Sequence, residues 1–222
     1  LSGAADPAIA GGKIFGMDGK EQRGGRRRRL TMRSAAATFL GLGWLKALNP
    51  GFVNINRNDE AEPSGPVPMD AVSGALMLIS RDSFDRLGGF DEGYFLHVED
   101  LDICRRAEAE GGTVIYTPLA SALHHGATSD APARAVERHK GAGLNRYFRK
   151  FAETPVEKLA ARVLGPLIGV LLSLRARVAK REGLVAVCRL RTVDAGAGRQ
   201  ELDEVVSRHL EGGQSLVIER VI

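Results

Sequence analysis

Carboxylates and imidazoles gather in one stretch of the chain, between residues 90 and 125. Two acidic turns, built from Asp91 with Glu92 and from Glu99, Asp100 and Asp102, are followed by a pair of histidines at positions 124 and 125. Carboxylates accept protons from hydroxyl groups, and carboxylates with imidazoles bind divalent metal ions. The residue types therefore predict acid–base or metal chemistry here.

A buried strand and two helices are expected to position these groups. The run from Met69 to Ile79 is apolar nearly throughout, which is typical of a strand covered on both faces. Within it, Gly74 allows either a sugar ring or a neighbouring backbone to approach closely. Residues 80–87 form a short helix, with Ser80 as its cap and Gly88 as its stop.

Residues 99–110 form the second helix, which ends at Gly111. Acidic residues in a first turn are stabilised by the helix dipole by about 0.3–1 kcal/mol each, which explains one or two of the three carboxylates structurally. Arg105 and Arg106 are placed to pair with acids one turn earlier. Residues 113–117 form a strand that Pro118 breaks, and residues 119–124 continue as an edge strand.

Upstream of these elements the pattern is weaker. Residues 1–12 are small and polar and predict a loop or a weak helix, and residues 13–22 predict a strand and a turn at Asp18-Gly19. Residues 34–48 predict a helix with Ser34 as N-cap, and residues 49–68 a surface loop.

Four consecutive arginines, residues 26–29, lie between the turn and this helix. They form either a solvated basic loop or a contact for anionic lipid headgroups or a substrate diphosphate. Nucleic acid is not an expected partner, since no stacking aromatic residues are interleaved with the arginines and no binding-module motif is present.

The C-terminal third predicts two amphipathic helices, over residues 133–151 and 155–180. Pro155 fits a helix start, whereas Pro166 is expected to kink or break the second helix. Its uncharged run, residues 163–174, is shorter than the roughly 20 residues that span a bilayer. That helix suits either a membrane interface or packing on the domain core or a partner. Residues 184–222 contain a strand-like segment, a helix-like pattern at 201–213 and a final apolar segment, without recognisable chemistry. They form either a small αβ appendage or residues added by fusion or a frameshift.

The composition is that of a globular protein with a small positive charge. The 222 residues are 44% hydrophobic and 26% charged, with a net charge of +4. Two cysteines do not make a disulfide framework, which favours a reducing cytoplasm. The N-terminus lacks the pattern of a signal peptide, and a start at Leu1 is consistent with a fragment of a longer protein.

The order of motifs from residue 72 to residue 126 resembles the C-terminal half of the catalytic domain of family 2 glycosyltransferases, particularly bacterial rhamnosyltransferase-like members. The matching segments are Ser73-Gly74-Ala75, Leu87-Gly88-Gly89-Phe90-Asp91-Glu92, Phe95, Glu99-Asp100-Leu101-Asp102, Cys104-Arg105-Arg106, Gly111, Tyr116-Thr117-Pro118 and His124. The resemblance extends weakly over residues 6–150. It implies an α/β fold, a partial GT-A (nucleotide-diphospho-sugar transferase-like) domain with a mixed sheet, followed by C-terminal helices and a small αβ tail.

The resemblance also implies a reaction and its partners. The parent enzyme would transfer a hexose such as rhamnose, with inversion, from a nucleotide-diphospho-sugar donor to a polysaccharide or lipid-linked glycan acceptor. This places it in the cytoplasm, in peripheral contact with the inner face of the plasma membrane. Asp100 would be the base, Glu99 would position it or the acceptor, and His124 would bind Mg²⁺ or Mn²⁺, with His125 as the alternative ligand. The expected substrate-binding residues are Ser73, Gly74, Asp91, Glu92, Arg105 and Arg106, and Asp102 is expected to be structural.

One departure from the family limits these expectations. The family binds its nucleotide with an N-terminal half that ends in an Asp-x-Asp motif, and no such motif occurs in the first seventy residues. The chain is therefore expected to be inactive alone, with the glycosyltransferase portion in residues 1–150, a helical segment in 151–183 and an appendage in 184–222. A non-catalytic module that binds a membrane surface or a partner is the main alternative, and a metal-dependent hydrolase using Asp100 and His124 is a weaker one.

Overall fold

The computed structural model describes residues 6, 8–124, 133–178, 186–188 and 216–218. The chain divides into two compact units, Leu1–Arg177 and Val178–Ile222. In the second unit, strands β7 (Ala186–Cys188) and β8 (Leu216–Ile218) pair in parallel. The helix-like pattern at 201–213 lies outside the described residues.

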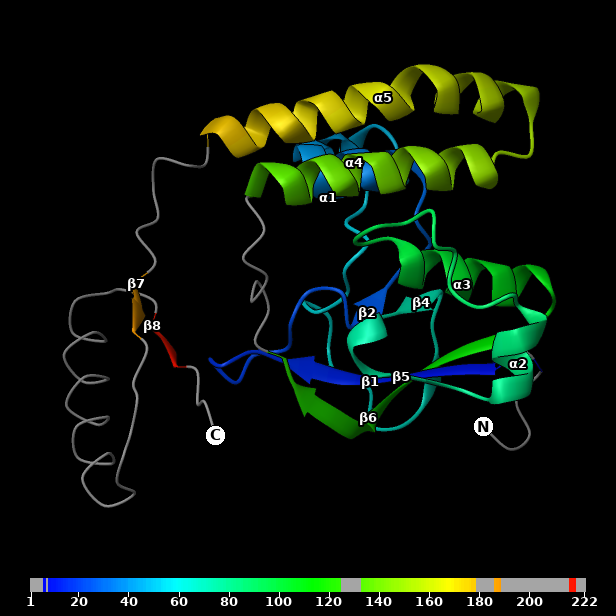
Figure 1. Ribbon diagram of the computed structural model, residues 1–222, viewed down its shortest axis with the longest axis vertical. Coiled ribbons are helices and arrows are strands. Elements are labelled where there is room, and N and C mark those ends of the chain that lie inside the picture. The colour runs from blue at the N-terminus through cyan, green and yellow to red at the C-terminus, as the bar shows by residue number, and fades with distance from the viewer. Residues whose placement is uncertain (1–5, 7, 125–132, 179–185, 189–215, 219–222) are drawn as a thin grey trace. The chain divides into compact units, whose positions relative to one another are not determined.

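The first unit is built on a four-stranded mixed sheet (Figure 1). The strands are β1 (Ala8–Phe15), β3 (Val67–Pro68), β5 (Met77–Ile79) and β6 (Thr113–Leu123), in the order β3-β6-β1-β5. β1 runs parallel to β6 and antiparallel to β5. A separate ribbon pairs β2 (Arg26–Arg27) with β4 (Ala71–Val72). The expected α/β class with a mixed sheet followed by helices is confirmed.

The central strand β1 corrects the prediction of a loop or weak helix over residues 1–12. A Cβ atom at Gly11 would lie 2.3 Å from the Cβ of Val72, and one at Gly12 would lie 2.3 Å from the Cδ2 of Leu76. Small residues form this strand because side chains from a distant segment fill the space beside it. The predicted turn is confirmed, since Gly19 has a φ of 71° and the amide of Gln22 donates to the carbonyl of Ile14.

The apolar run 69–79 is not the continuous covered strand that was expected. It is divided into β4, a 3₁₀ turn η2 (Gly74–Leu76) and β5. The hydroxyl of Ser73 accepts from the amide of Ala75 at 3.2 Å and so favours the turn over an extended strand. β5 lies at the edge of the sheet, and Leu78 is 65% exposed on one face while Met77 and Ile79 are partly buried on the other.

The helices that flank the acidic cluster form as predicted. α2 (Arg81–Arg86) is capped by Ser80, and α3 (Glu99–Ala109) ends before Gly111, which has a φ of 79°. Helix α1 (Met32–Leu40) begins earlier than expected, with Thr31 as its cap, and a 3₁₀ helix η1 (Leu42–Ala47) follows it. Ser34 is therefore not the N-cap but the third helical residue, which completes a capping box with Thr31.

Two prolines are accommodated without ending their elements. β6 continues past Pro118, and its register with β1 shifts there, from Gly12 opposite Thr117 to Lys13 opposite Ser121. Such a bulge tolerates a residue without an amide hydrogen. Pro166 lies inside the continuous helix α5 (Pro155–Val178), so the expected break is absent.

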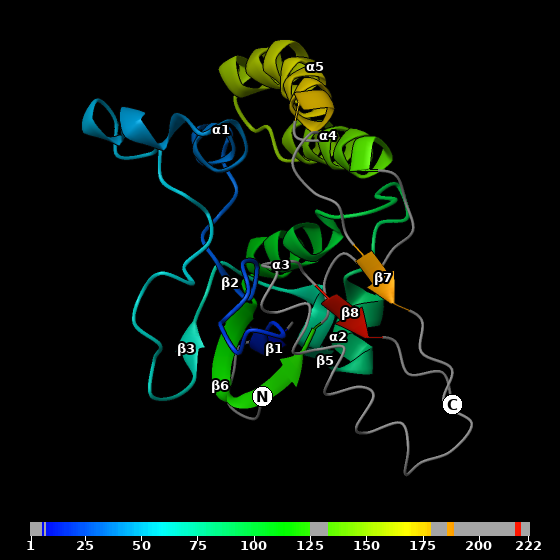
Figure 2. The same cartoon turned by 90° about the vertical axis from the view of Figure 1, so that its left-hand side faces the viewer.

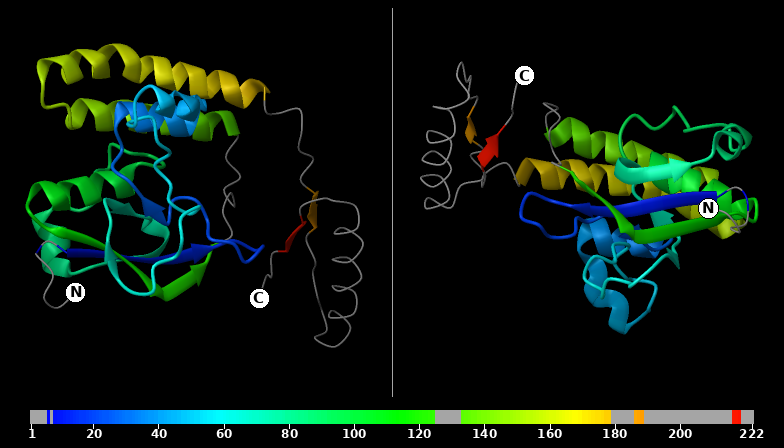
Figure 3. Two further views of the ribbon diagram at one scale, coloured as in Figure 1. Left: turned by 180° about the vertical axis from the view of Figure 1, so that it is seen from behind. Right: turned by 90° about the horizontal axis from the view of Figure 1, so that it is seen from below.

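Helix α3 lies between the sheet and a hairpin of α4 (Ala133–Lys150) and α5, as seen from three sides (Figures 1, 2 and 3). One hydrophobic core joins these layers and includes Ile9, Ile103, Tyr116, Leu144 and Leu172. α4 and α5 approach closely, since a Cβ at Gly141 would lie 2.6 Å from the Cα of Gly169. None of the helices within the described ranges is long and apolar enough to cross a membrane.

Candidate active site at the start of helix α3

The carboxylate of Asp100 accepts four hydrogen bonds. Arg27 donates from Nη1 to Oδ1 at 3.2 Å and from Nη2 to Oδ2 at 2.7 Å. The amide of Gly74 donates to Oδ2 at 3.1 Å, and the amide of Leu101 to Oδ1 at 2.8 Å. Since a carboxylate has about four lone-pair sites, all of them are filled.

Arg27 is held as firmly as the carboxylate that it binds. Its Nη2 also donates to the carbonyl of Val72 at 2.6 Å, and the side chains of Arg27 and Asp100 are only 9% and 13% exposed. Burial alone would raise the pKa of Asp100, but the charge and hydrogen bonds of Arg27 outweigh burial and lower that pKa. Asp100 is therefore an anion at neutral pH.

The backbone immediately before this carboxylate is strained. His97 and Val98 have φ values of 65° and 77°, in the left-handed region. For a β-branched residue such as Val98 this is a rare conformation. Helix α4 approaches there without a side chain, because a Cβ at Gly143 would lie 3.3 Å from both the His97 carbonyl oxygen and a methyl group of Val98. Packing thus holds a turn that the residues themselves disfavour.

Glu99 has an environment opposite to that of Asp100. Its side chain is partly buried, and within the described structure its Oε2 atom is sealed from solvent without a hydrogen-bond partner. Burial raises the pKa of Glu99, and the negative charge of Asp100 adds to that rise. Adjacent carboxyl groups with opposed pKa shifts are suited to different roles in proton transfer.

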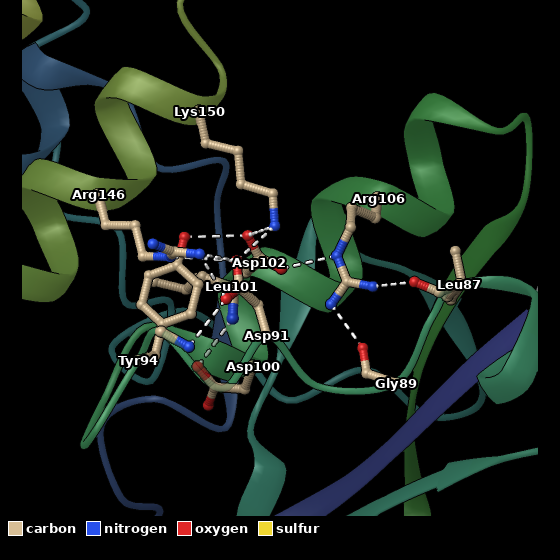
Figure 4. A network of polar contacts seen from close by, with 11 residues as sticks. Leu87, Gly89, Asp91, Tyr94, Asp100, Leu101, Asp102, Arg106, Arg146 and Lys150 are labelled. Carbon is tan, nitrogen blue, oxygen red and sulfur yellow. Dashed lines mark hydrogen bonds and ion pairs between the residues drawn. The ribbon is translucent and has the colours of Figure 1, made fainter.

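A buried ionic network anchors α3 to its neighbours (Figure 4). Asp102 is fully buried and contacts the Tyr94 hydroxyl at 2.9 Å, Nε of Arg106 at 2.7 Å and Nζ of Lys150 at 2.8 Å. Arg106 also donates to the carbonyl oxygens of Leu87 and Gly89. The expected structural role of Asp102 and its pairing with Arg106 are confirmed.

Asp91 belongs to the same anchor. It accepts from Arg146 at 2.7 Å, from Lys150 at 2.8 Å and from the amide of Gly93 at 2.9 Å. Burial would raise the pKa of Asp91, but these donors outweigh it and hold the pKa well below its usual value. The contacts tie the acidic turn to α4.

The other expected substrate-binding residues are dispersed. Ser73 and Gly74 lie beside Asp100, and Glu92 is exposed. Arg105 does not pair with an acid one turn earlier, because its Nη1 binds Glu108 at 3.0 Å and its Nη2 binds Glu153 at 3.3 Å. The structure therefore brings only Ser73 and Gly74 to the candidate base.

His124 follows the last residue of β6 and is exposed. Its Nδ1 lies 2.9 Å from Oε1 of Gln22, and its amide donates to the carbonyl of Phe15. In the part of the chain that the structure describes, no three His, Cys, Asp or Glu side chains could jointly hold a metal ion, and no polar contact joins His124 to Asp100. His125 lies outside the described residues.

The arginine run is not a solvated loop. Arg26 and Arg27 are 3% and 8% exposed, and the four arginines pair in order with Glu21, Asp100, Glu60 and Glu108. Sequence reasoning missed the role of Arg27 because its partner lies 73 positions away and nothing local to the run marks it.

Curated relatives of the chain are sugar transferases. It is 33% identical over 126 residues to the N-acetylglucosaminyl-diphospho-decaprenol L-rhamnosyltransferase of Mycobacterium tuberculosis strain H37Rv, covering 55% of this chain and 40% of that protein. It is 39% identical over 57 residues to rhamnosyltransferase WbbL of Escherichia coli K12, covering 26% of this chain and 22% of the relative. A Haloferax volcanii hexosyltransferase for low-salt glycan biosynthesis, Agl10, is 29% identical over 58 residues, which are 26% of this chain and 19% of Agl10.

No family model matches the chain. The chain spans less than half the length of these relatives. The similarity nonetheless agrees with the α/β fold. The expected resemblance is confirmed: this chain is related to part of the rhamnosyltransferase-like glycosyltransferases of the GT-A fold.

Proposed function

We propose that the chain is the acceptor-side half of an inverting family 2 glycosyltransferase. It would transfer a hexose such as rhamnose from a nucleotide-diphospho-sugar to a polysaccharide or lipid-linked glycan. The observation that carries this proposal is a nearly buried Asp100 whose lowered pKa keeps it ionised at neutral pH, at a strained helix start, in a chain similar to rhamnosyltransferases. The name of one relative specifies a lipid-linked diphospho-sugar acceptor.

In the proposed reaction, the acceptor hydroxyl oxygen attacks the anomeric carbon from the side opposite the diphosphate. The bond between that carbon and the diphosphate oxygen breaks with its electron pair on the diphosphate, and the hydroxyl proton passes to Asp100. All acceptor sites on Asp100 are filled, so the hydroxyl must displace one donor. Gly74 is the donor that we assign, since it is exposed and its hydrogen bond of 3.1 Å is among the longest.

Arg27 and Glu99 are proposed to have different supporting roles beside Asp100. Arg27 keeps Asp100 ionised and fixes both of its oxygens, which lowers its basicity but defines its position. Glu99 would position Asp100 or the acceptor. Its Oε2 has no partner among the described residues but is sealed from solvent, so a hydrogen bond to the acceptor would require this side chain to turn outward.

The resemblance implies Mg²⁺ or Mn²⁺ on the donor diphosphate, where the ion would neutralise the leaving group. The described residues do not fit a complete site, since His124 is the sole expected ligand and its Nδ1 faces Gln22. We therefore derive no step through the ion. His124 remains a proposed single ligand.

Transfer should be tested in the complete gene product that contains this chain, with a labelled nucleotide-diphospho-rhamnose and a lipid-linked acceptor. Asp100→Asn is expected to lower the turnover number by at least about 100-fold, the usual contribution of a general base, with donor binding retained. Glu99→Gln should act mainly on the KM for the acceptor. Near-normal turnover in Asp100→Asn would remove the residue from the base role.

A non-catalytic module that binds a membrane surface or a partner is the second candidate, because helix α5 exposes a long apolar face. Its exposed large hydrophobic residues are Val156, Leu159, Val163, Leu164, Leu167, Val170, Leu171 and Leu174. Lys158 and Arg162 add positive charge to the same helix, as in interfacial helices. Co-sedimentation with anionic vesicles that weakens in salt, together with no binding of any nucleotide sugar, would favour this candidate over the transferase.

A further inference from the structure

A groove separate from Asp100 lies between the start of α1, helix α3 and the α4–α5 hairpin. Its volume is about 720 Å³, and it is lined by residues 29–33, Gly51, Arg105 and one face of each helix of the hairpin. That volume is within the range of small-molecule sites. None of the reaction steps proposed above uses this groove.

The floor of the groove is aromatic and aliphatic. Tyr147 and Phe148 are nearly buried, and their rings meet edge to face with centroids 5.9 Å apart. The ring of Phe151 lies 4.7 Å from that of Tyr147. Leu30 and Val156 also line the groove. An apolar chain is therefore the natural ligand of this part.

Three arginines lie around this floor, and one of them has no ion pair. Arg29 and Arg105 both bind Glu108, and Arg105 also binds Glu153, so their charges are largely compensated. Arg33 makes no ion pair within the described part of the chain. An anion at Arg33 would gain a charge-assisted hydrogen bond without breaking an existing pair. Two carboxylates also line the groove: Glu153, which pairs with Arg105, and Glu157, which accepts from the amides of Glu153 and Thr154. The groove thus offers an apolar floor and, among its described lining residues, one cation without an ion pair.

The groove is open along α5. Val156 and Leu164 line it and are themselves exposed, and Leu159 and Val163 continue the apolar surface next to them. A chain longer than the groove can therefore leave it along this helix. Helix α3 carries both Asp100, in its first turn, and Arg105, which lines the groove.

We propose that this groove binds the isoprenoid chain and the diphosphate of a lipid-linked acceptor, with the diphosphate at Arg33. The inference rests on the proposed function for the identity of the lipid, because one relative is named for a diphospho-decaprenol acceptor. Because Arg29 and Arg105 are already paired with carboxylates, the groove has little positive charge to attract an anionic bilayer surface. Its concave apolar floor and open end instead fit a single-chain lipid diphosphate.

The test measures binding of farnesyl diphosphate, a soluble isoprenyl diphosphate, to the full 222-residue chain by isothermal titration calorimetry. Val156→Asp puts a carboxylate into the groove and, in the first turn of α5, does not oppose helix formation. Leu159→Asp is its matched control, since Leu159 is 64% exposed against 76% for Val156 but does not line the groove. Arg33→Gln removes the cation, with Lys158→Gln as its control.

Binding is expected to weaken about tenfold or more in Val156→Asp and Arg33→Gln, the equivalent of one charge-assisted contact, and by less than about twofold in both controls. Inorganic diphosphate and farnesol should each bind more weakly than the joined molecule. The proposal is overturned if farnesyl diphosphate does not bind, if Leu159→Asp weakens binding as much as Val156→Asp, or if only anionic vesicles bind. No sugar is transferred in the calorimetric assay, so absence of farnesyl diphosphate binding would leave the transferase proposal standing. Conversely, a negative transfer assay would not change the interpretation of the binding result.

Discussion

Replacing Arg27 by Met should destabilise the first unit strongly. The substitution keeps an apolar stem of similar length but removes the cation and three hydrogen bonds, two to Asp100 and one to the Val72 carbonyl. Both side chains of the pair are nearly buried. Leaving a buried carboxylate without its partner costs about 3–5 kcal/mol, which is a large share of the roughly 5–15 kcal/mol that stabilises a domain.

The loss of unfolding free energy in Arg27→Met should depend on pH, and the pKa of Asp100 sets the direction. In the native protein the pKa of Asp100 is lowered, so its stabilisation is complete above the unfolded value of about 3.9 and disappears as pH falls through the folded pKa. In Arg27→Met, burial without the cation raises the pKa of Asp100. As pH falls from 7 towards 5, Asp100 is therefore increasingly protonated, and the free-energy cost of burying an unpaired charge decreases. The difference between the two proteins is therefore expected to shrink on acidification.

Urea denaturation followed by circular dichroism at pH 7 and pH 5 measures this difference. Arg28→Met is the matched control, because the neighbouring pair with Glu60 is about one third exposed and should contribute less than about 1 kcal/mol. Equal losses in the two variants, or a loss in Arg27→Met that stays constant with pH, would refute the reasoning about the buried pair.

Gly11→Ala should lower the free energy of unfolding by about 1–3 kcal/mol, since the new Cβ meets Val72, whereas Gly43→Ala, in open space, should not; urea melts compare them. Asp91→Asn should accelerate amide hydrogen exchange along α4, because Arg146 loses its carboxylate and Lys150 keeps only its contact with Asp102, and unchanged exchange would contradict this. The lowered pKa of Asp91 means that its stabilisation is present above the unfolded value and is lost as pH falls through the folded one. Chelation of metal ions should leave the Tm of this chain unchanged, and a fall of several degrees would reveal a metal site.

Helix boundaries were predictable because their signals are local. Ser80 and Gly88 bracket α2, and the glycine after residue 110 ends α3, all within one turn of the helices they delimit. The exception is α1, where two hydroxyl residues compete for the cap. Thr31 takes that position because Ser34 completes the capping box with it, and a pattern of residue types does not rank the two.

Strands were predicted less well because distant residues decide them. β1 contains two adjacent glycines, which propensity disfavours in a strand. They are required because Val72 and Leu76 occupy the space where their side chains would lie. Conversely, the run 69–79 had the composition of a covered strand, but its last part forms a sheet edge, and edge position is a property of topology alone.

In the candidate site too, residues marked by a local motif were predictable and a residue with a distant partner was not. The resemblance supplied Asp100 and its neighbour Gly74, and the structure joins them by a hydrogen bond. Arg27 could not be identified, since the run that contains it pairs with acids spread over the chain. The resemblance also gave Asp100 and His124 roles in one reaction, but their described polar contacts involve different segments, and their joint use stays a prediction.

The position of the Asp100 carboxylate is set by three segments that meet only in the folded protein. β2 supplies the guanidinium, the turn at Gly74 supplies one amide, and α3 supplies the amide of Leu101. The left-handed pair His97–Val98 sets the direction in which α3 starts, and α4 holds that pair by presenting Gly143 to it. Strain of this kind persists only where surrounding packing overrides local preference. Enlarging Gly143 should therefore displace the carboxylate without touching it, which makes α4 part of the machinery that orients the proposed base.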